Sequence, residues 1–341
     1  MKMTVEALEK ELNTGKLKSL YFLYGEESYL LENAVKKIKK QFGEMVAGIN
    51  YIVIDETNLE EIIPNLETPA FGYEKKMLVI KNSGLLKKDG KKKNTRLEQI
   101  REKVSSYLIE NKEEIENHDI LLFIEDEAGS NKLTKTIEEV GVSCNFERQK
   151  PQQLAKRLRA ICQAYHVTIE DRTINYFLEC CGTNMQDLIN EIRKLIEYAG
   201  KGGKITKEAI DKLATKQIEA IIFDLTDNLG KKKIKEAQEV LKNLILAKEP
   251  IQKILITLYN HFKKLYFIKL ADKYNKNIAE SIKLKPNQMF LVNKYKMQAG
   301  YFKEKELRKL LTELSELDSN YKIGLIDLQV GLEAILCCYC S

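Results

Sequence analysis

Five short, almost unbroken apolar runs in the first 146 residues constrain the fold more than any other feature. They are LYFLY at 20–24, YIVID at 51–55, KMLVIK at 76–81, DILLFIE at 119–125 and VSCNF at 142–146. Parallel strands that are covered on both faces have such solid apolar runs. Segments with helical spacing lie between them, at about 28–42, 58–66, 95–116 and 131–139. This alternation predicts an α/β domain with a parallel sheet.

The strand pattern disappears at Pro151, and apolar residues then recur at intervals of three and four. Residues 151–199 predict a small bundle of three helices, which the glycines of GKGG at 200–203 bring to an end. Thr206 is an expected N-cap for one more short helix.

Residues 216–341 have helical spacing throughout, including a long segment at 251–274 that starts after Pro250. The last predicted helix, at about 325–338, is apolar on several sides, which is typical of a helix that is buried inside its own domain or against other subunits. The expected fold class is therefore α/β plus all-α, and a chain of 341 residues is long enough for several domains. We expect three domains, with the ranges 1–146, 147–214 and 215–341.

The composition, 44% hydrophobic and 31% charged, is that of a soluble globular protein. No apolar stretch is long enough to cross a membrane, and the first twenty residues have an amphipathic helical pattern instead of the apolar core of a signal peptide. We expect a cytoplasmic protein that does not contact a membrane.

Cysteine and histidine spacing gives no sign of a metal site or of a nucleophile. The seven cysteines match no zinc-site spacing, and Cys180 and Cys181 are adjacent on a predicted helix. None of the three histidines, His118, His166 and His261, lies in a serine or cysteine nucleophile motif. We expect reduced thiols, no metal, no cofactor and no catalytic residue.

Positive charge is concentrated in the last third of the chain. Residues 213–341 contain 22 Lys and Arg against 15 Asp and Glu, whereas the net charge of the whole chain is +6. Such a bias is compatible with nucleic-acid contact, and it is equally compatible with lysines that only keep a helical bundle soluble.

The turn after the first apolar run is the place where a nucleotide-binding domain has its phosphate loop. Gly25 follows the predicted strand, but the second glycine and the Lys-Ser/Thr pair of G-x-x-x-x-G-K-[ST] are missing. Glu26 and Glu27 occupy positions where phosphates would dock, and like charges repel there. Their other explanation is a favourable interaction with the helix dipole.

A second acidic group, Glu125 to Glu127, follows the run at 119–125, where a nucleotidase would hold magnesium. Because the phosphate loop with its lysine is missing, no bound triphosphate is expected whose magnesium ion these carboxylates could hold. Two interpretations stay open: an inert nucleotidase-like fold, which we favour, and residual nucleotide binding.

The chain resembles the delta subunits of bacterial DNA polymerase III along its whole length. The resemblance rests on these segments in this order: FLYGEESYLLENAVKKI at 22–38, LETPAFGYEKKMLVIKN at 66–82, LLFIEDEAGSNKLTKTIEEVG at 121–141, CGTNMQDLINEIRKL at 181–195, IFDLTDNLGKKKIKEAQEVLKNLILAKEPIQKILITLYNHFKKL at 222–265 and LDSNYKIGLIDLQVGLEAIL at 317–336. Each segment alone is weakly specific for the family, whereas their order and spacing together are much more specific.

The resemblance implies a RecA-like AAA+ parallel-sheet domain, a small helical lid domain and an all-helical collar domain. It also implies a subunit that hydrolyses no ATP itself and opens the sliding beta clamp. The implied partners are this clamp, ATPase clamp-loader subunits of the gamma/tau type, a delta-prime type subunit, and primed DNA as part of the complex.

The family contacts the clamp with two apolar residues on a loop after a helix. In LETPAFGYEKK, Phe71 matches the second, aromatic position, and Ala70 replaces the larger residue usual at the first. Pro69 stiffens the approach and Gly72 allows a sharp exit, and Leu66 or Tyr73 is a candidate for the missing contact. The alternative is that Phe71 packs against the core of its own sheet.

Possible DNA contacts in the collar are Lys231, Lys232 and Lys233, which are equally well explained as solvated residues, and Tyr295, for which core packing is the commoner outcome. A lysine-rich loop at 81–96 is more typical of a solvated connection than of a DNA contact. Two rival functions remain: an active AAA+ NTPase with an unusual loop, and a stand-alone DNA-binding protein.

Overall fold

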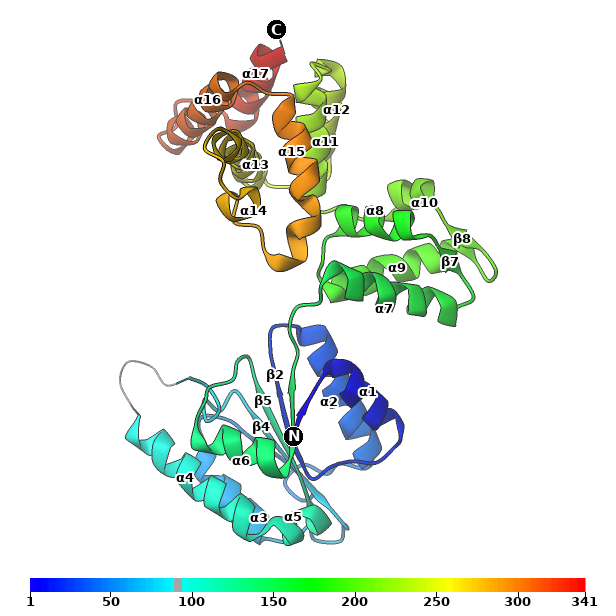
Figure 1. Ribbon diagram of the computed structural model, residues 1–341, viewed down its shortest axis with the longest axis vertical. Helices are drawn as coiled ribbons and strands as arrows, with labels where there is room; N and C mark the ends of the chain where they lie inside the picture. Colours follow the sequence, from blue (N-terminus) through cyan, green and yellow to red (C-terminus); the bar gives the residue numbers. More distant parts are fainter. Residues whose placement is uncertain (89–93, 341) are drawn as a thin grey trace. The chain divides into compact units, whose positions relative to one another are not determined.

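A six-stranded parallel sheet organises the first 148 residues, and helices make up nearly all of the remainder (Figure 1). The computed structural model describes residues 1–88 and 94–340. The chain divides into two units, Met1–Arg148 and Gln149–Ser341, and each is described by itself. The finer division into three domains, with boundaries at 146 and 214, stays a prediction.

The strands of the first unit have the order β1-β6-β2-β5-β4-β3, and every neighbouring pair is parallel. Their bounds are β1 Lys2–Met3, β2 Leu20–Tyr24, β3 Tyr51–Ile54, β4 Lys76–Lys81, β5 Asp119–Glu125 and β6 Val142–Asn145. The helices are α1 Val5–Asn13, α2 Ser28–Phe42, η1 Leu59–Glu61, α3 Ile62–Glu67, α4 Thr95–Glu110, α5 Lys112–His118 and α6 Lys132–Val140. The predicted α/β alternation is confirmed.

Helices cover both faces of this sheet, which explains why the strands are apolar throughout. In β2, Leu20 and Phe22 join the core under η1 and α3 to α6, whereas Tyr21 and Leu23 join the core under α1 and α2. Figure 1 shows α1 and α2 on one side of the strands and α3, α4, α5 and α6 on the other.

The start of the chain differs from the expected continuous helix. Lys2 and Met3 form an edge strand that pairs with β6, and α1 begins only after Thr4, whose side chain accepts a hydrogen bond from the Ala7 amide. A two-residue strand is too short to produce a periodic signal in the sequence, so only its pairing reveals it.

The second unit is helical apart from one small parallel pair, β7 and β8. Its elements are α7 Pro151–Ala164, β7 Thr168–Ile169, α8 Asp171–Cys181, α9 Met185–Ala199, β8 Lys204–Ile205, α10 Lys207–Leu213, α11 Ile218–Gly230, α12 Ile234–Leu246, α13 Ile251–Lys273, α14 Ile278–Ser281, η2 Pro286–Leu291, α15 Val292–Gly300, α16 Glu304–Lys322 and α17 Leu328–Cys340. The three helices predicted over 151–199 are α7, α8 and α9, and the Thr206 hydroxyl caps α10 as expected.

A single apolar core joins α11, α12, α13, α15, α16 and α17. The last helix contributes Leu328, Leu332 and Leu336 to it, but Val330 on the other side of α17 is 60% exposed. One face of α17 therefore packs within its own unit, and packing of the other face against another subunit stays a prediction.

No helix within residues 1–88 and 94–340 is long and apolar enough to span a membrane. The six cysteines whose side chains the structure describes are free thiols, and four of them are buried.

Candidate functional site

The central strand β2 lies between β6 and β5. The strand before it in the sequence, β1, lies beyond β6, and the strand after it, β3, lies beyond β5 and β4, so the order of strands reverses at β2. In open α/β sheets, ligands bind at the carboxyl ends of strands beside such a switch point. Only three residues, Gly25 to Glu27, connect β2 to α2 here. A phosphate loop has eight positions, so this connection is too short to wrap a phosphate.

The chain's own backbone fills this turn. The Gly25 amide donates to the Glu125 carbonyl at 3.3 Å, and the Glu27 amide donates to the Phe146 carbonyl at 2.9 Å. The Phe146 amide in turn donates to the Tyr24 carbonyl at 2.6 Å. Two amides of the turn are therefore already bonded to protein carbonyls.

Gly25 permits this close approach. Its φ is +129°, and a Cβ placed on it would lie 2.4 Å from the Phe146 carbonyl oxygen. The two predicted acidic positions differ in surroundings, because Glu26 is an exposed residue paired with Arg148 at 2.7 Å, whereas Glu27 is buried at the start of α2.

The acidic end of β5 is also occupied by contacts within the chain. Glu125 is buried, and its Oε1 accepts hydrogen bonds from the Ser83 hydroxyl at 2.6 Å and the Gly84 amide at 2.9 Å. The Lys87 ammonium lies 3.8 Å from its Oε2. Burial raises the pKa of this carboxyl, and these donors oppose the rise. Glu125 thus ties the segment after β4 to β5.

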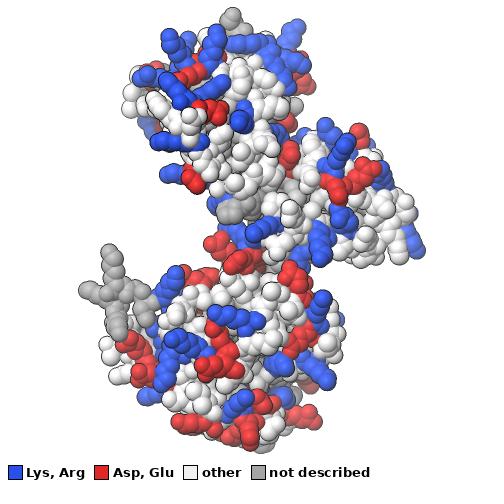
Figure 2. Space-filling view, in the orientation of Figure 1, with Lys and Arg blue, Asp and Glu red and all other residues white. Residues whose placement is uncertain are grey.

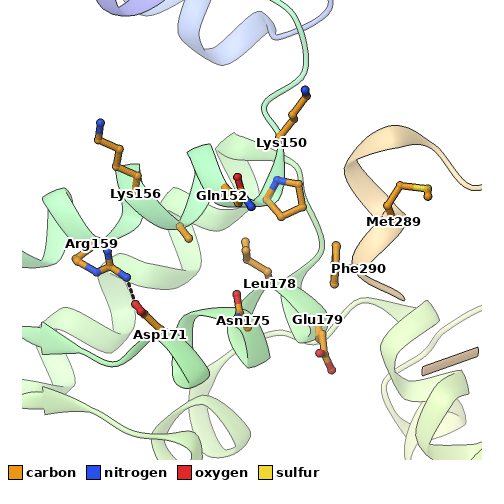
Figure 3. A pocket seen from close by; sticks show the side chains of 12 residues that line it. Lys150, Gln152, Lys156, Arg159, Asp171, Asn175, Leu178, Glu179, Met289 and Phe290 are labelled. Carbon is orange, nitrogen blue, oxygen red and sulfur yellow. Dashed lines mark hydrogen bonds and ion pairs between the residues drawn. The ribbon is translucent and has the colours of Figure 1, made fainter. Parts of the chain in front are cut away.

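No group of three or more His, Cys, Asp or Glu suited to a metal ion occurs among the residues that the structure describes. The second unit has a groove of about 930 Å³ between α7, α8 and η2, shown in Figure 3. Asp171 on its wall is paired with Arg159, and Glu179 is paired with Lys294 at 3.3 Å. Both carboxylates of this groove are therefore engaged in ion pairs.

The second candidate site is the loop after α3. The Tyr73 amide donates to the Ala70 carbonyl at 3.2 Å, which closes a four-residue turn. Gly72 has a φ of +79°, the conformation that a type II turn requires at its third position. Phe71 occupies the second position, and its side chain is 89% exposed. It does not pack against the core of its own sheet.

The other residues predicted for this loop have different surroundings. Leu66 is 6% exposed and belongs to the core under α3, so it is not available as an outward contact. Ala70 and Tyr73 are half-buried, whereas Pro69 is exposed. Tyr73 also lines a cavity of about 430 Å³ at the amino ends of the strands.

A residue that sequence reasoning missed closes the base of the same loop. Lys76, the first residue of β4, is 3% exposed. Its Nζ donates to the Asn65 carbonyl at 2.6 Å, to the Thr68 Oγ1 at 3.1 Å and to the Thr68 carbonyl. A lysine beside another lysine in YEKKM gives no signal of burial.

The predicted DNA contacts in the second unit are partly engaged elsewhere. Lys231 to Lys233 are exposed, but Lys231 is paired with Asp227 at 3.8 Å, and Lys232 bonds to the Tyr339 carbonyl. Tyr295 is 3% exposed, and its ring packs against Phe223 and His261. Its ring is therefore unavailable for base stacking, which supports the core-packing alternative.

Figure 2 shows Lys and Arg side chains predominating over the last helices of the chain, with basic and acidic residues intermixed on the sheet unit. In the lysine-rich loop, Lys87 contacts Glu125 and Asp126. Lys91, Lys92 and Lys93 lie outside the described residues.

The fold and these sites define the class of the protein. Counted from β2, the strands β6-β2-β5-β4-β3 have the order 5-1-4-3-2 of a RecA-like nucleotide-binding domain, with β1 added at one edge. The turn that would hold phosphate is short and filled by its own backbone. The first unit is thus a RecA-like domain without a phosphate loop.

Comparison with known proteins places the chain more closely. Residues 21–149 match the family described as DNA polymerase III, delta subunit, and residues 219–339 match the C-terminal domain of that subunit. DNA polymerase III subunit delta of Bacillus subtilis (strain 168) is 25% identical over 337 residues, which cover 96% of this chain and 94% of that protein. The probable DNA polymerase III subunit delta of Aquifex aeolicus (strain VF5) is 28% identical over 339 residues, which cover 95% and 92%.

The structure of the Bacillus subtilis DNA clamp loader delta protein matches with a TM-score of 0.71 and 23% identity, over 98% of this chain and 99% of that one. This match shows the shared fold. The chain belongs to the family of DNA polymerase III delta subunits.

Proposed function

We propose that this chain is the clamp-opening subunit of a DNA polymerase III clamp loader. It binds the sliding beta clamp through the turn Ala70–Tyr73, with Phe71 as the main anchor. It hydrolyses no ATP itself. The clamp is held open because the subunit binds the open conformation of the ring more tightly than the closed one.

The observation that carries this proposal is the exposure of Phe71. Its side chain is 89% exposed, more than that of any other large apolar residue among those that the structure describes. Keeping a phenylalanine in water forgoes about 1.5–3 kcal/mol of burial free energy. Substituting alanine for an aromatic anchor that is buried in a partner's pocket typically costs about 2 kcal/mol or more of binding free energy.

The absence of catalysis is supported by the turn after β2. The Gly25 and Glu27 amides bond to protein carbonyls, and the sequence has no phosphate-loop lysine. Glu125, where a nucleotidase would hold magnesium, is bonded to Ser83 and Gly84. In this proposal the energy for the loading cycle comes from ATPase subunits of the gamma/tau type.

The remaining proposed partners are a delta-prime type subunit and primed DNA. Lys233 is the best placed of the three collar lysines for a phosphate contact, because Lys231 and Lys232 already contact Asp227 and Tyr339. The basic character of residues 213–341 supports a surface that faces nucleic acid within the complex.

The experiment that tests this function is the affinity of the purified chain for the sliding clamp from the same source, measured for wild type and Phe71→Ala. We expect the substitution to weaken binding by about tenfold or more, which corresponds to about 1.4 kcal/mol. Ile109→Ala is the matched control, because Ile109 is also an exposed apolar residue, at 52%, and lies on α4. It should leave the affinity unchanged.

Tight binding that survives Phe71→Ala would move the anchor to another residue of the turn, with Tyr73 next. No binding by the correctly folded wild-type chain would contradict the proposed function itself.

A further inference from the structure

The base of the Phe71 turn is closed by one buried charge. Lys76 is 3% exposed, although a lysine is rarely buried unless its charge is compensated. An ammonium group has three protons to donate, and the three acceptors within reach are the Asn65 carbonyl and the carbonyl and hydroxyl of Thr68. All three belong to the end of α3.

This placement is electrostatically favourable. The last carbonyls of a helix have no partner within the helix and form the negative end of its dipole, where a cation is stabilising. Thr68 is the C-cap residue of α3, and its hydroxyl also donates to the Pro64 and Asn65 carbonyls, at 3.2 and 3.3 Å. Lys76 and Thr68 thus replace the hydrogen bonds that the end of α3 lacks.

Asp119 is the second charged residue beside this lysine. It lies directly opposite Lys76 in the register of β4 and β5, and it is 4% exposed. Burial lowers the pKa of Lys76, and the negative charge of Asp119 opposes that fall. The ammonium form that donates three hydrogen bonds is thereby supported from the sheet side.

The loop has two fastenings. Its ends, Thr68 and Lys76, are bonded to each other, and at its tip the Tyr73 amide bonds to the Ala70 carbonyl. Phe71 projects from between these fastenings with an exposed side chain. An anchor that is already fixed does not have to be ordered when it binds, and ordering a side chain on binding costs about 0.5–1.5 kcal/mol.

We propose that Lys76 is a positioning residue for clamp binding: it fastens the end of α3 to β4 and so holds the Phe71 turn in its binding conformation before the partner arrives. This inference rests on the proposed function for its binding consequence. Its conformational consequence, an ordered turn in the free chain, does not depend on any partner.

The test uses Lys76→Met in the full chain, because methionine keeps an unbranched side chain and removes the charge and the donors. Lys75→Met is the matched control, because the neighbouring Lys75 donates to the Glu116 carbonyl at 3.1 Å and not to α3. Amide hydrogen exchange is measured without clamp. We expect faster exchange over residues 66–73 in Lys76→Met but not in Lys75→Met or in wild type. The amides of β2 and β5 should stay protected in all three proteins.

The binding arm is a double-mutant cycle with Phe71→Ala. We expect Lys76→Met to weaken clamp binding by about fivefold or more, about 1 kcal/mol. Phe71→Ala should then cost clearly less in the Lys76→Met background than in wild type, because a mobile anchor contributes less. A residue with a merely structural role would lower the melting temperature and leave this coupling at zero.

Thr68→Val supplies an independent variant that keeps Lys76 and removes the hydroxyl, which is one of its three acceptors and also the donor to the Pro64 and Asn65 carbonyls. It should shift exchange and affinity in the same direction by a smaller amount. Unchanged exchange over 66–73 in either folded variant would overturn the proposal. If the wild-type chain binds no clamp, the proposed function fails, and the exchange arm still decides the role of Lys76.

Discussion

At residue 25 the fold tolerates no side chain. Gly25 combines a φ of +129° with a Phe146 carbonyl oxygen that would lie 2.4 Å from any Cβ. A residue other than glycine in such a conformation costs about 1–3 kcal/mol, and the contact additionally forces a shift of the Phe146 backbone just after β6. The turn whose amides bond to protein carbonyls is therefore also a point of high structural constraint.

Gly25→Ala should accordingly lower the free energy of unfolding by about 3 kcal/mol. Gly72→Ala is the comparison, because its φ of +79° is also positive but no atom lies within 4 Å of an added Cβ. It should lose about 1 kcal/mol only. Denaturant unfolding followed by circular dichroism gives both values, and equal losses would show that the contact with Phe146 is not the cause.

Individual residues differ in how far the sequence reveals them. Leu66 was expected as a candidate clamp contact, but it is buried, in agreement with the helical spacing from Ile62 to Leu66. Phe71 was placed by resemblance to a family, because its spacing fits a core position equally well. The role of Lys76 depends on carbonyls eleven and eight positions away that only the folded chain brings together.

Among the elements, α11, α13 and α15 share one buried polar network. The His261 Nε2 and Gln298 Oε1 atoms lie 2.8 Å apart, and the Gln298 Nε2 donates to the Phe223 carbonyl at 2.8 Å and to Asp227 at 2.5 Å. Since Gln298 uses its amide N–H groups there, its Oε1 accepts from a neutral His261. Burial lowers the pKa of His261 to about 3.

This shift predicts a loss of stability in mild acid. The pKa of His261 lies at about 3 in the folded chain and at 6.5 in the unfolded chain, so the unfolded state takes up the proton first as the pH falls. The contribution of neutral His261 to the free energy of unfolding is complete above pH 6.5, and it decreases by about 1.4 kcal/mol for each pH unit below that value. Between pH 7 and pH 5 the free energy of unfolding therefore falls by about 2 kcal/mol.

His261→Gln should remove this contribution, because glutamine offers an N–H donor to Gln298 and does not titrate. Denaturant unfolding at pH 7 and pH 5 should therefore show a fall in stability that is about 2 kcal/mol smaller in the variant than in wild type. A parallel fall in both proteins would mean that His261 is protonated in the folded state.

Long, strongly patterned elements were predictable from the sequence. The runs 76–81 and 119–125 coincide with β4 and β5, and the segment 28–42 coincides with α2. The pairs β1 with β6 and β7 with β8 were missed, because strands of two residues have no period. The strand order was also beyond the sequence alone, since it depends on which strand pairs with which.

For the whole molecule, the proposed clamp contact lies entirely in the first unit. Phe71, Lys76 and the two cores of the sheet all belong to Met1–Arg148. We therefore expect a fragment of residues 1–148 to fold alone and to bind the clamp within about threefold of the full chain. The same fragment with Phe71→Ala is its control. A folded fragment without affinity would show that the second unit supplies part of the contact.

The filled turn after β2 also has a consequence for regulation. A ligand shifts a conformational equilibrium only by its difference in affinity for the two states. At this turn the Gly25 and Glu27 amides already donate to carbonyls of the same chain, so neither amide is available to a phosphate in this conformation. Within the proposed function, a dependence of clamp binding on the cellular ATP-to-ADP ratio is therefore expected to come from the proposed ATPase subunits and not from this turn.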